Sequence, residues 1–252
     1  LNLALMSELL SLDYTDRAAE LVAVTLSEQP ASFGNQFLAG KYHTSIGQPV
    51  QAIDYYRKAA SYGDEDLRPL LSIAALLTGM GRYDEAEQQI NDVVELDNKS
   101  YEAYQSLLAV YVARNKRSEG IALLSSLAEE NEVSEPLLVL SNYFAKTGAA
   151  SESETFLVAA GAGNGKADRQ WRAVNASIYA ERAQLSYRSG KFDEARSFVF
   201  TALNSYPANR KLLGLLISIE LGAGALGEAK KILKELKQMH PESQLGLIRE
   251  GD

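Results

Sequence analysis

The sequence predicts an all-α protein, a solenoid of antiparallel helix pairs. A small residue recurs at a near-constant interval, a turn-forming residue precedes it by five positions, and an apolar residue follows it by four. The small residues, at steps of 34, 34, 34, 33, 42 and 34, are Ala18, Ala52, Ala86, Gly120, Ser153, Ala195 and Ala229. A fixed period in this range is typical of stacked helical repeats.

The residues around each small position predict a helix, a tight turn and a second helix. Before the turn, apolar residues at helical spacing lie within 67–79 and 101–114. After it, one apolar face follows the small residue. The turn residues are of types that enter the left-handed region at low cost, namely Asp13, Gly47, Gly81, Asn115, Gly148, Gly190 and Gly224. Neither helix can bury its apolar stripe alone, so the units must stack.

Taken in order, the spacing divides the chain into seven units. They are residues 1–32, 33–66, 67–100, 101–133, 134–167, 176–209 and 210–243, and residues 244–252 begin a further one. Pro30, Pro207 and Pro241 stand where three of the second helices should stop. We expect one continuous solenoid, residues 1–252, that is a fragment of a longer array.

The step of 42 contains eight extra residues, which we place in an inserted link within 161–175. Gly161–Lys166 is the most flexible stretch of the sequence. Asp168 is an N-cap candidate for a helix that runs through Trp171, Val174, Ile178 and Leu185 and is longer than its counterparts. The insertion is interpreted as a surface loop, with a hinge or a binding lip as the alternative.

At the best-preserved turns the chain resembles the tetratricopeptide repeat (TPR) family. The matching segments are Gly190-Lys-Phe-Asp-Glu-Ala195, which leads to Pro207, and Gly81-Arg-Tyr-Asp-Glu-Ala86. The resemblance implies a right-handed superhelix whose concave groove is lined by the first helix of each unit. The alanine- and glycine-rich texture also resembles bacterial envelope proteins of polysaccharide export or surface-protein sorting. This favours the bacterial periplasm or cell envelope over the cytoplasm.

The family's groove positions imply a set of partner-binding residues on the first helices. Chaperone-binding members grip a C-terminal carboxylate with Lys, Asn and Arg side chains, but Ser72 and Ser106 stand where two of those would be needed. The carboxylate clamp is therefore absent, and the groove suits an extended peptide or a helix. The candidate residues are Phe37, Lys41, Leu71, Gln105, Asn142, Gln184 and Tyr187.

Composition and motifs argue against several other functions. The chain has 25 basic and 33 acidic residues, a net charge of −8, which disfavours nucleic-acid binding. No apolar run is long enough for a membrane span. Cysteine is absent, so disulfides, thiol catalysis and cysteine-ligated zinc are excluded. His43 and His240 lack a second ligand at metal-binding spacing, and we expect no bound metal.

The glycines around residue 163 do not form a phosphate-binding loop. Ala160 stands at the first glycine position and Ala167 replaces the hydroxyl that would bind magnesium. No nucleophile with its base is evident either, so we predict no cofactor and no enzyme activity. The sequence predicts a non-catalytic scaffold for protein–protein interaction. The alternatives are a structural spacer, or a regulatory or enzymatic protein whose active domain lies outside this segment.

Overall fold

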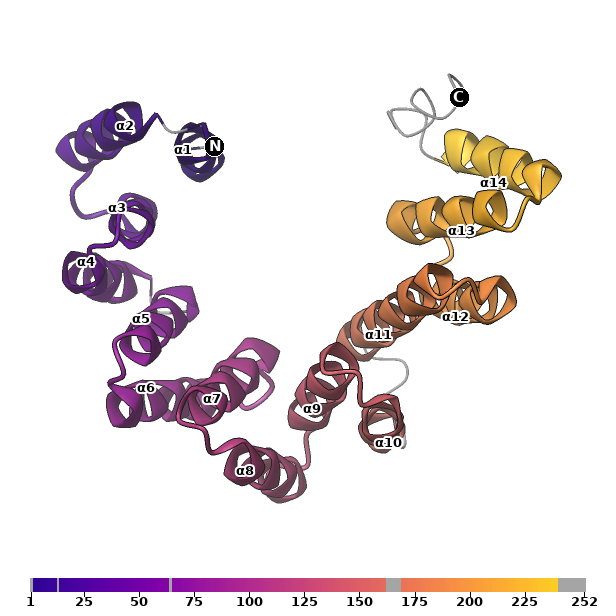
Figure 1. The fold of residues 1–252 in the computed structure, drawn as a ribbon. Helices are drawn as coiled ribbons and strands as arrows, with labels where there is room; N and C mark the ends of the chain where they lie inside the picture. The colour runs from indigo at the N-terminus through magenta and orange to yellow at the C-terminus, as the bar shows by residue number, and fades with distance from the viewer. Residues whose placement is uncertain (1, 13, 64, 162–168, 240–252) are drawn as a thin grey trace. The chain divides into compact units, whose positions relative to one another are not determined.

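The computed structural model describes residues 2–12, 14–63, 65–161 and 169–239. These residues form fourteen α-helices and no strand (Figure 1), which confirms the predicted all-α fold. None of the helices in these ranges has both the length and the apolarity needed to cross a membrane. The odd-numbered helices are the first helices of the repeat pairs, and the even-numbered ones are the second helices. In order they are α1 (Asn2–Ser11), α2 (Thr15–Glu28), α3 (Phe33–Ser45), α4 (Pro49–Tyr62), α5 (Arg68–Gly79), α6 (Tyr83–Leu96), α7 (Tyr101–Ala113), α8 (Arg117–Glu130), α9 (Glu135–Lys146), α10 (Ala150–Ala160), α11 (Arg169–Arg188), α12 (Phe192–Ser205), α13 (Arg210–Gly222) and α14 (Leu226–Met239).

Local sequence signals start several of these helices. The Ser100 hydroxyl accepts a bond from the Ala103 N–H at the start of α7, and the Asn209 side chain accepts two at the start of α13. These caps satisfy backbone donors that have no partner within the helix. Proline stands in the first turn of α4, α5 and α9, where its missing N–H costs nothing.

The turn between the two helices of a repeat pair is a Schellman motif. At Gly81, the Gly81 N–H donates to the Thr78 carbonyl (3.0 Å) and the Arg82 N–H donates to the Leu77 carbonyl (2.9 Å). The residue at this position is left-handed in six turns, while the seventh, Asp13, lies outside the described residues. The φ angles run from 60° to 82° at Gly47, Gly81, Asn115, Gly148, Gly190 and Gly224.

The small residues are buried where the two helices of a repeat pair cross. Ala52, Ala86 and Ala195 are 0% exposed. A Cβ on Gly120 would lie 2.6 Å from the Cβ of Tyr111, closer than real atoms approach. The period in the sequence therefore marks the closest packing in the fold.

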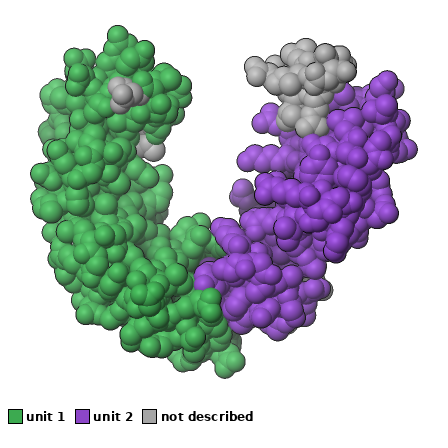
Figure 2. Space-filling model, viewed as in Figure 1, with its two compact units in different colours: residues 1–133 green, residues 134–252 purple. Residues whose placement is uncertain are grey.

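The chain falls into two compact units, Leu1–Val133 with α1–α8 and Ser134–Asp252 with α9–α14 (Figure 2). Within each unit, most helices that are neighbours in sequence pack together, although α10 and α11 do not pack closely. First helices also pack on first helices, at α1–α3 and α5–α7 in one unit and at α9–α11 and α11–α13 in the other. In each unit, these pairs of first helices thus lie side by side. The seven repeat boundaries stay a prediction.

The longest described helix is α11, with 20 residues, as the apolar pattern after Asp168 predicts. Residues 169–175 belong to this helix, and Val174 continues the buried stripe of Ile178. The Trp171 ring is partly buried and its Nε1–H donates to the Leu157 carbonyl of α10 (3.3 Å). Gly161 ends α10, and the rest of the proposed flexible segment, with Asp168, lies outside the described residues.

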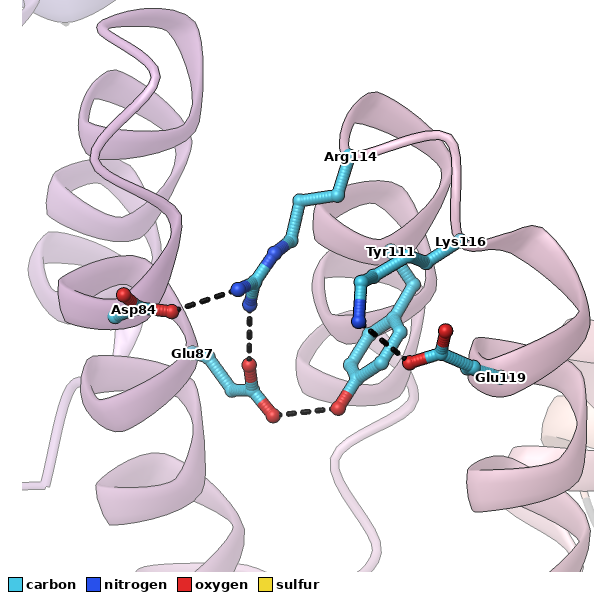
Figure 3. A network of polar contacts seen from close by, with 6 residues as sticks. All are labelled: Asp84, Glu87, Tyr111, Arg114, Lys116 and Glu119. Atoms are coloured by element: carbon cyan, nitrogen blue, oxygen red, sulfur yellow. Dashed lines mark hydrogen bonds and ion pairs between the residues drawn. The ribbon is translucent and has the colours of Figure 1, made fainter.

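Polar bridges join the second helix of one pair to the first helix of the next. The Arg114 guanidinium, at the end of α7, reaches back to Asp84 (2.8 Å) and Glu87 (3.0 Å) on α6 (Figure 3). The Tyr111 hydroxyl donates to the other Glu87 oxygen (2.6 Å). This bond raises the pKa of Tyr111 to about 12, because the carboxylate holds the phenol in its protonated form.

Comparable bridges recur in the second unit. Arg196 on α12 donates to both carboxylate oxygens of Glu220 on α13 (2.7 and 2.9 Å), and Glu154 on α10 pairs with Arg182 on α11 (3.5 Å). Glu87, Glu154 and Arg196 each directly follow the buried small residue of their second helix. We call the residue after that small residue the bridging position.

Candidate functional site

In the first unit, the predicted residues Phe37 and Lys41 lie on α3. Phe37 is only 5% exposed, and its ring stacks on Phe33 with 5.7 Å between centroids. The Arg68 guanidinium of α5 lies over the Phe37 ring at 5.2 Å. Phe37 therefore packs α3 against its neighbours, while Lys41 is exposed, with its ammonium 5.9 Å from the Phe37 ring centroid.

Leu71 and Gln105 lie on α5 and α7, two first helices that pack together. Leu71 is half-buried and Gln105 is exposed. Sequence reasoning missed Arg68, which joins this face through its stacking on Phe33 and Phe37. Asp66 holds the Arg68 side chain with bonds of 2.9 and 3.0 Å, and this pairing lowers the pKa of Asp66. One signal for this pairing was visible in the sequence: Asp66 and Arg68 are two positions apart at the start of α5.

In the second unit, Asn142 lies on α9, and Gln184 and Tyr187 lie on α11, which packs on α9. Gln184 is exposed, whereas Asn142 is half-buried. The Tyr187 ring packs at 6.0 Å from that of Phe192, and a Cβ on Gly222 of α13 would lie 2.8 Å from it. Tyr187 is thus held in place between helices.

A cleft of about 960 Å³ opens beside Tyr187, between α13 and α14. Ile217 and Ala229 are buried in it, whereas Leu221 is 42% and Leu226 61% exposed. We call this the α13–α14 cleft. It is lined by Tyr187, Ile217, Ser218, Leu221, Leu226, Ala229, Lys230, Leu233, Lys234 and Lys237.

Among the described residues that line the α13–α14 cleft, the charged ones are all lysines. Lys230, Lys234 and Lys237 follow one another at helical spacing along α14, beside the apolar Leu226 and Leu233. In a chain of net charge −8, the cleft is a local concentration of positive charge. The family's groove positions did not indicate it, although the lysines of residues 230–237 were visible in the sequence.

The candidate residues and the histidine of α3 differ from what metal binding would need. Within the described residues, no group of three or more His, Cys, Asp or Glu could hold a metal ion. His43 is engaged in packing: its ring stacks on Tyr55 at 5.0 Å and its Nδ1 lies 2.7 Å from Gln48 Oε1. The exposed groups are amide, lysine and apolar side chains, which suit recognition of a polypeptide.

Comparison with known proteins supports the repeat family. Residues 46–111 match the family model described as tetratricopeptide repeat, which confirms the resemblance inferred from the spacing. No curated protein matches the sequence. Similar solved structures include PilF of Pseudomonas aeruginosa, with 17% identity and a TM-score of 0.43 over 99% of this chain and 95% of that one.

Two further solved structures are similar to a comparable degree. A tetratricopeptide repeat protein of Parabacteroides merdae has 18% identity and a TM-score of 0.44, over 94% of this chain and 91% of that one. A thermophilic tetratricopeptide repeat protein of Thermus thermophilus has 19% identity and a TM-score of 0.42, over 75% of this chain and 99% of that one. Identities this low carry no information on partners.

Proposed function

We propose that this chain, whose residues 46–111 match the tetratricopeptide repeat model, is a non-catalytic scaffold that binds a segment of a partner protein. Proteins of this family are generally scaffolds. The observation that carries the proposal is the side-by-side packing of first helices within each unit, with exposed polar side chains at Lys41, Gln105 and Gln184.

The exposed side chains suit an extended or helical polypeptide. Amide groups such as those of Gln105 and Gln184 can both donate to and accept from a partner's backbone. The half-buried Leu71 of α5 offers an apolar contact on the helix that packs against the helix of Gln105. Phe37 in one compact unit and Tyr187 in the other are packed, so each would hold the first helices of its own unit rigid, and rigidity lowers the entropic cost of binding.

The test is affinity capture with matched variants, followed by binding measurements with the purified partner. The variant Lys41→Glu/Gln105→Lys changes exposed residues of α3 and α7. The control Lys58→Glu/Gln88→Lys makes the same charge changes at exposed positions of the second helices α4 and α6. We expect the partner to bind the wild type and the control, and to bind the first-helix variant at least about tenfold more weakly.

Two outcomes would contradict the proposal. Loss of binding in the control alone would place the site on the second helices. The absence of any partner that binds in purified form would favour a structural spacer. The ion-paired bridges at α6–α7 and α12–α13, which stiffen the array, are what favours that second candidate.

A further inference from the structure

In the first unit, α3 and α5 are the two first helices whose charged side chains are positive. Apart from the stacked His43, α3 carries Lys41 and α5 carries Arg68, and neither of these fully described helices carries a carboxylate. The first helices on either side carry one carboxylate each, Glu8 on α1 and Glu102 on α7. In a chain of net charge −8, α3 and α5 therefore present a local positive charge.

The two positive helices lie inside the array. The first helix α1 packs on α3, the first helix α7 packs on α5, and the second helix α4 packs on both α3 and α5. With these neighbours in place, Lys41 is exposed and the Arg68 side chain is 63% exposed. Both cations are therefore accessible although described helices continue the array on either side.

One aromatic ring brings Lys41 and Arg68 together. The Lys41 Nζ lies 5.9 Å and the Arg68 Cζ lies 5.2 Å from the centroid of the Phe37 ring. The Arg68 guanidinium also lies over the Phe33 ring, at 5.8 Å from its centroid. The negative face of an aromatic ring attracts a cation, and this attraction offsets part of the repulsion between the two positive groups. The sequence thus places two like charges close together and holds them there.

Asp66 neutralises Arg68 along one edge of the guanidinium. The Asp66 carboxylate accepts from Nε and Nη2 of Arg68, which leaves the two N–H groups of Nη1. Within the described part of the chain, neither Nη1 nor the Lys41 ammonium has a hydrogen-bond or ion-pair partner. Both groups form stronger bonds with a carboxylate than with a neutral acceptor. The ligand that suits them is an acid.

We call the surface formed by Phe33, Phe37, Lys41, Arg68 and Leu71 the α3–α5 face. We propose that this face binds a Glu or Asp side chain within a segment of the partner protein. The carboxylate would accept from Nη1 of Arg68 and from the Lys41 ammonium, and a neighbouring apolar side chain would contact Leu71, one turn after Arg68. This inference rests on the proposed scaffold function and names the charge of the partner segment.

The test uses the full chain and two short labelled peptides with amidated C-termini, so that neither has a terminal carboxylate. Both peptides contain two polar side chains between leucines, which are Glu in one peptide and Gln in the other. Fluorescence anisotropy measures their binding. We expect the Glu peptide to bind at least about fivefold more tightly than the Gln peptide, with a preference that falls as salt rises.

Matched variants locate the preference. Lys41→Gln/Arg68→Gln should remove it, because both cations of the α3–α5 face are lost. The control Arg57→Gln/Lys58→Gln makes the same changes at two exposed positions of α4 and should keep the preference. Both variants alter the net charge by the same amount, so a difference between them cannot come from net charge. Circular dichroism verifies that the variants are folded.

Asp66→Asn tests Arg68 in the opposite direction. An amide can still accept from the Arg68 backbone N–H, as the carboxylate does at 3.0 Å, but it no longer competes for the guanidinium as a charged group. We expect this variant to bind the Glu peptide about threefold more tightly and the Gln peptide with unchanged affinity. Unchanged or weaker binding of the Glu peptide would overturn the pairing of the acid with Arg68, and with it the proposal.

The remaining outcomes separate this inference from the scaffold function. Equal binding of both peptides, or binding of neither, would overturn acid recognition, while capture with Lys41→Glu/Gln105→Lys still tests the scaffold. Loss of the preference in the α4 control alone would place the acid on the second helices. A Gln peptide with a free C-terminus that binds as tightly as the amidated Glu peptide would show that chain ends are recognised instead. Either of these results would overturn a side-chain site on the α3–α5 face.

Discussion

At the scale of single residues, the fold depends on small side chains at the positions where the helices of a pair cross. Ala86 and Ala195 are 0% exposed and lie where the helices of a pair cross. The neighbouring helix fills the space that a larger side chain would need, and a close-packed interior cannot yield it without moving backbone.

We expect Ala86→Leu to reduce the free energy of unfolding by about 1–3 kcal/mol through overpacking. The control is Gln88→Leu, which introduces the same side chain at an exposed position of the same helix and should change stability by less than about 0.5 kcal/mol. Urea unfolding of both variants measures the difference. Equal midpoints would show that the small positions are not the packing contacts described above.

Tyr111 is a residue whose contribution depends on pH. Its pKa is raised to about 12 by the hydrogen bond to Glu87, against an ordinary value near 10. A raised pKa means that the folded state holds the proton more tightly. The stabilisation is therefore fully present below about pH 10 and is lost as the pH rises through about 12.

We expect Tyr111→Phe to cost about 1 kcal/mol at neutral pH, because the bond to a charged acceptor is removed. The difference in unfolding free energy between wild type and variant should shrink between about pH 10 and pH 12. Urea unfolding over this range, with both proteins measured at each pH, makes the comparison. A constant difference would show that the bond to Glu87 does not hold the phenol's proton.

Side-chain placement shows where sequence reasoning stopped at this scale. The family pattern assigns Phe37 to a groove, but stacking on Phe33 and Arg68 buries it. That burial depends on residues of α5 that no local period connects to α3. By contrast, the burial of the small positions follows from the period itself, because each one repeats the same local geometry.

At the scale of helices and turns, two glycines two residues apart have opposite roles. Gly81 is left-handed, with φ of +74°, whereas Gly79 is the last residue of α5 and a Cβ there would meet nothing within 4 Å. The left-handed position of Gly81 favours glycine over alanine, since a Cβ clashes with its own backbone there. The second only tolerates it.

We therefore expect changes of opposite sign from the same substitution. Gly81→Ala should destabilise by about 1–2 kcal/mol, the cost of a left-handed alanine. Gly79→Ala should stabilise by up to about 1 kcal/mol, because alanine favours the helix and restricts the unfolded chain. Thermal unfolding of the two variants provides the measurement, and a shift of the same sign in both would contradict the turn geometry.

The bridge between α12 and α13 should contribute more to the free energy of unfolding than a surface ion pair does. The Glu220 side chain is only 4% exposed and depends on Arg196 for compensation of its charge. Arg196→Met should cost about 2 kcal/mol, a figure that allows for the partial exposure of the arginine. Lys116→Met, which breaks the exposed pair with Glu119, should cost less than about 0.5 kcal/mol. Equal costs, by urea unfolding, would mean that Glu220 is solvated in solution.

The helices were the part of the structure that the sequence predicted best. Their spacing, turns and apolar faces are all local, so the first helix of each pair could be placed from the sequence. The α8–α9 connection was not anticipated: Glu132 is left-handed there, with φ of +52°, although glutamate has no special tendency toward that region. The α13–α14 cleft was also missed, because it results from three helices meeting.

At the scale of the whole molecule, contacts are short in range. Every substantial helix contact within the described residues joins helices that are adjacent or next but one along the chain. A strain introduced in one pair therefore has no direct route to distant pairs, as is general for stacked repeats.

Hydrogen exchange should show this directly. In Ala86→Leu, we expect faster amide exchange in α5, α6 and α7 and unchanged exchange in α13 and α14. Mass spectrometry of the exchanging chain, compared with the wild type, gives the protection of each helix. Uniformly faster exchange throughout would indicate that the array unfolds as a single cooperative body.

The bridging positions carry one further consequence, which concerns the order of the pairs. On the helix that follows, Glu87 contacts a phenol and an arginine, Glu154 contacts an arginine and Arg196 contacts a carboxylate. If α12 were followed by α11 instead of α13, Arg196 would face the helix that carries Arg182. Shuffled arrangements are thus penalised by repulsion or by buried unpaired charge. The bridges favour the native order of the helix pairs over other orders, and so disfavour misassembly of a repetitive chain during folding.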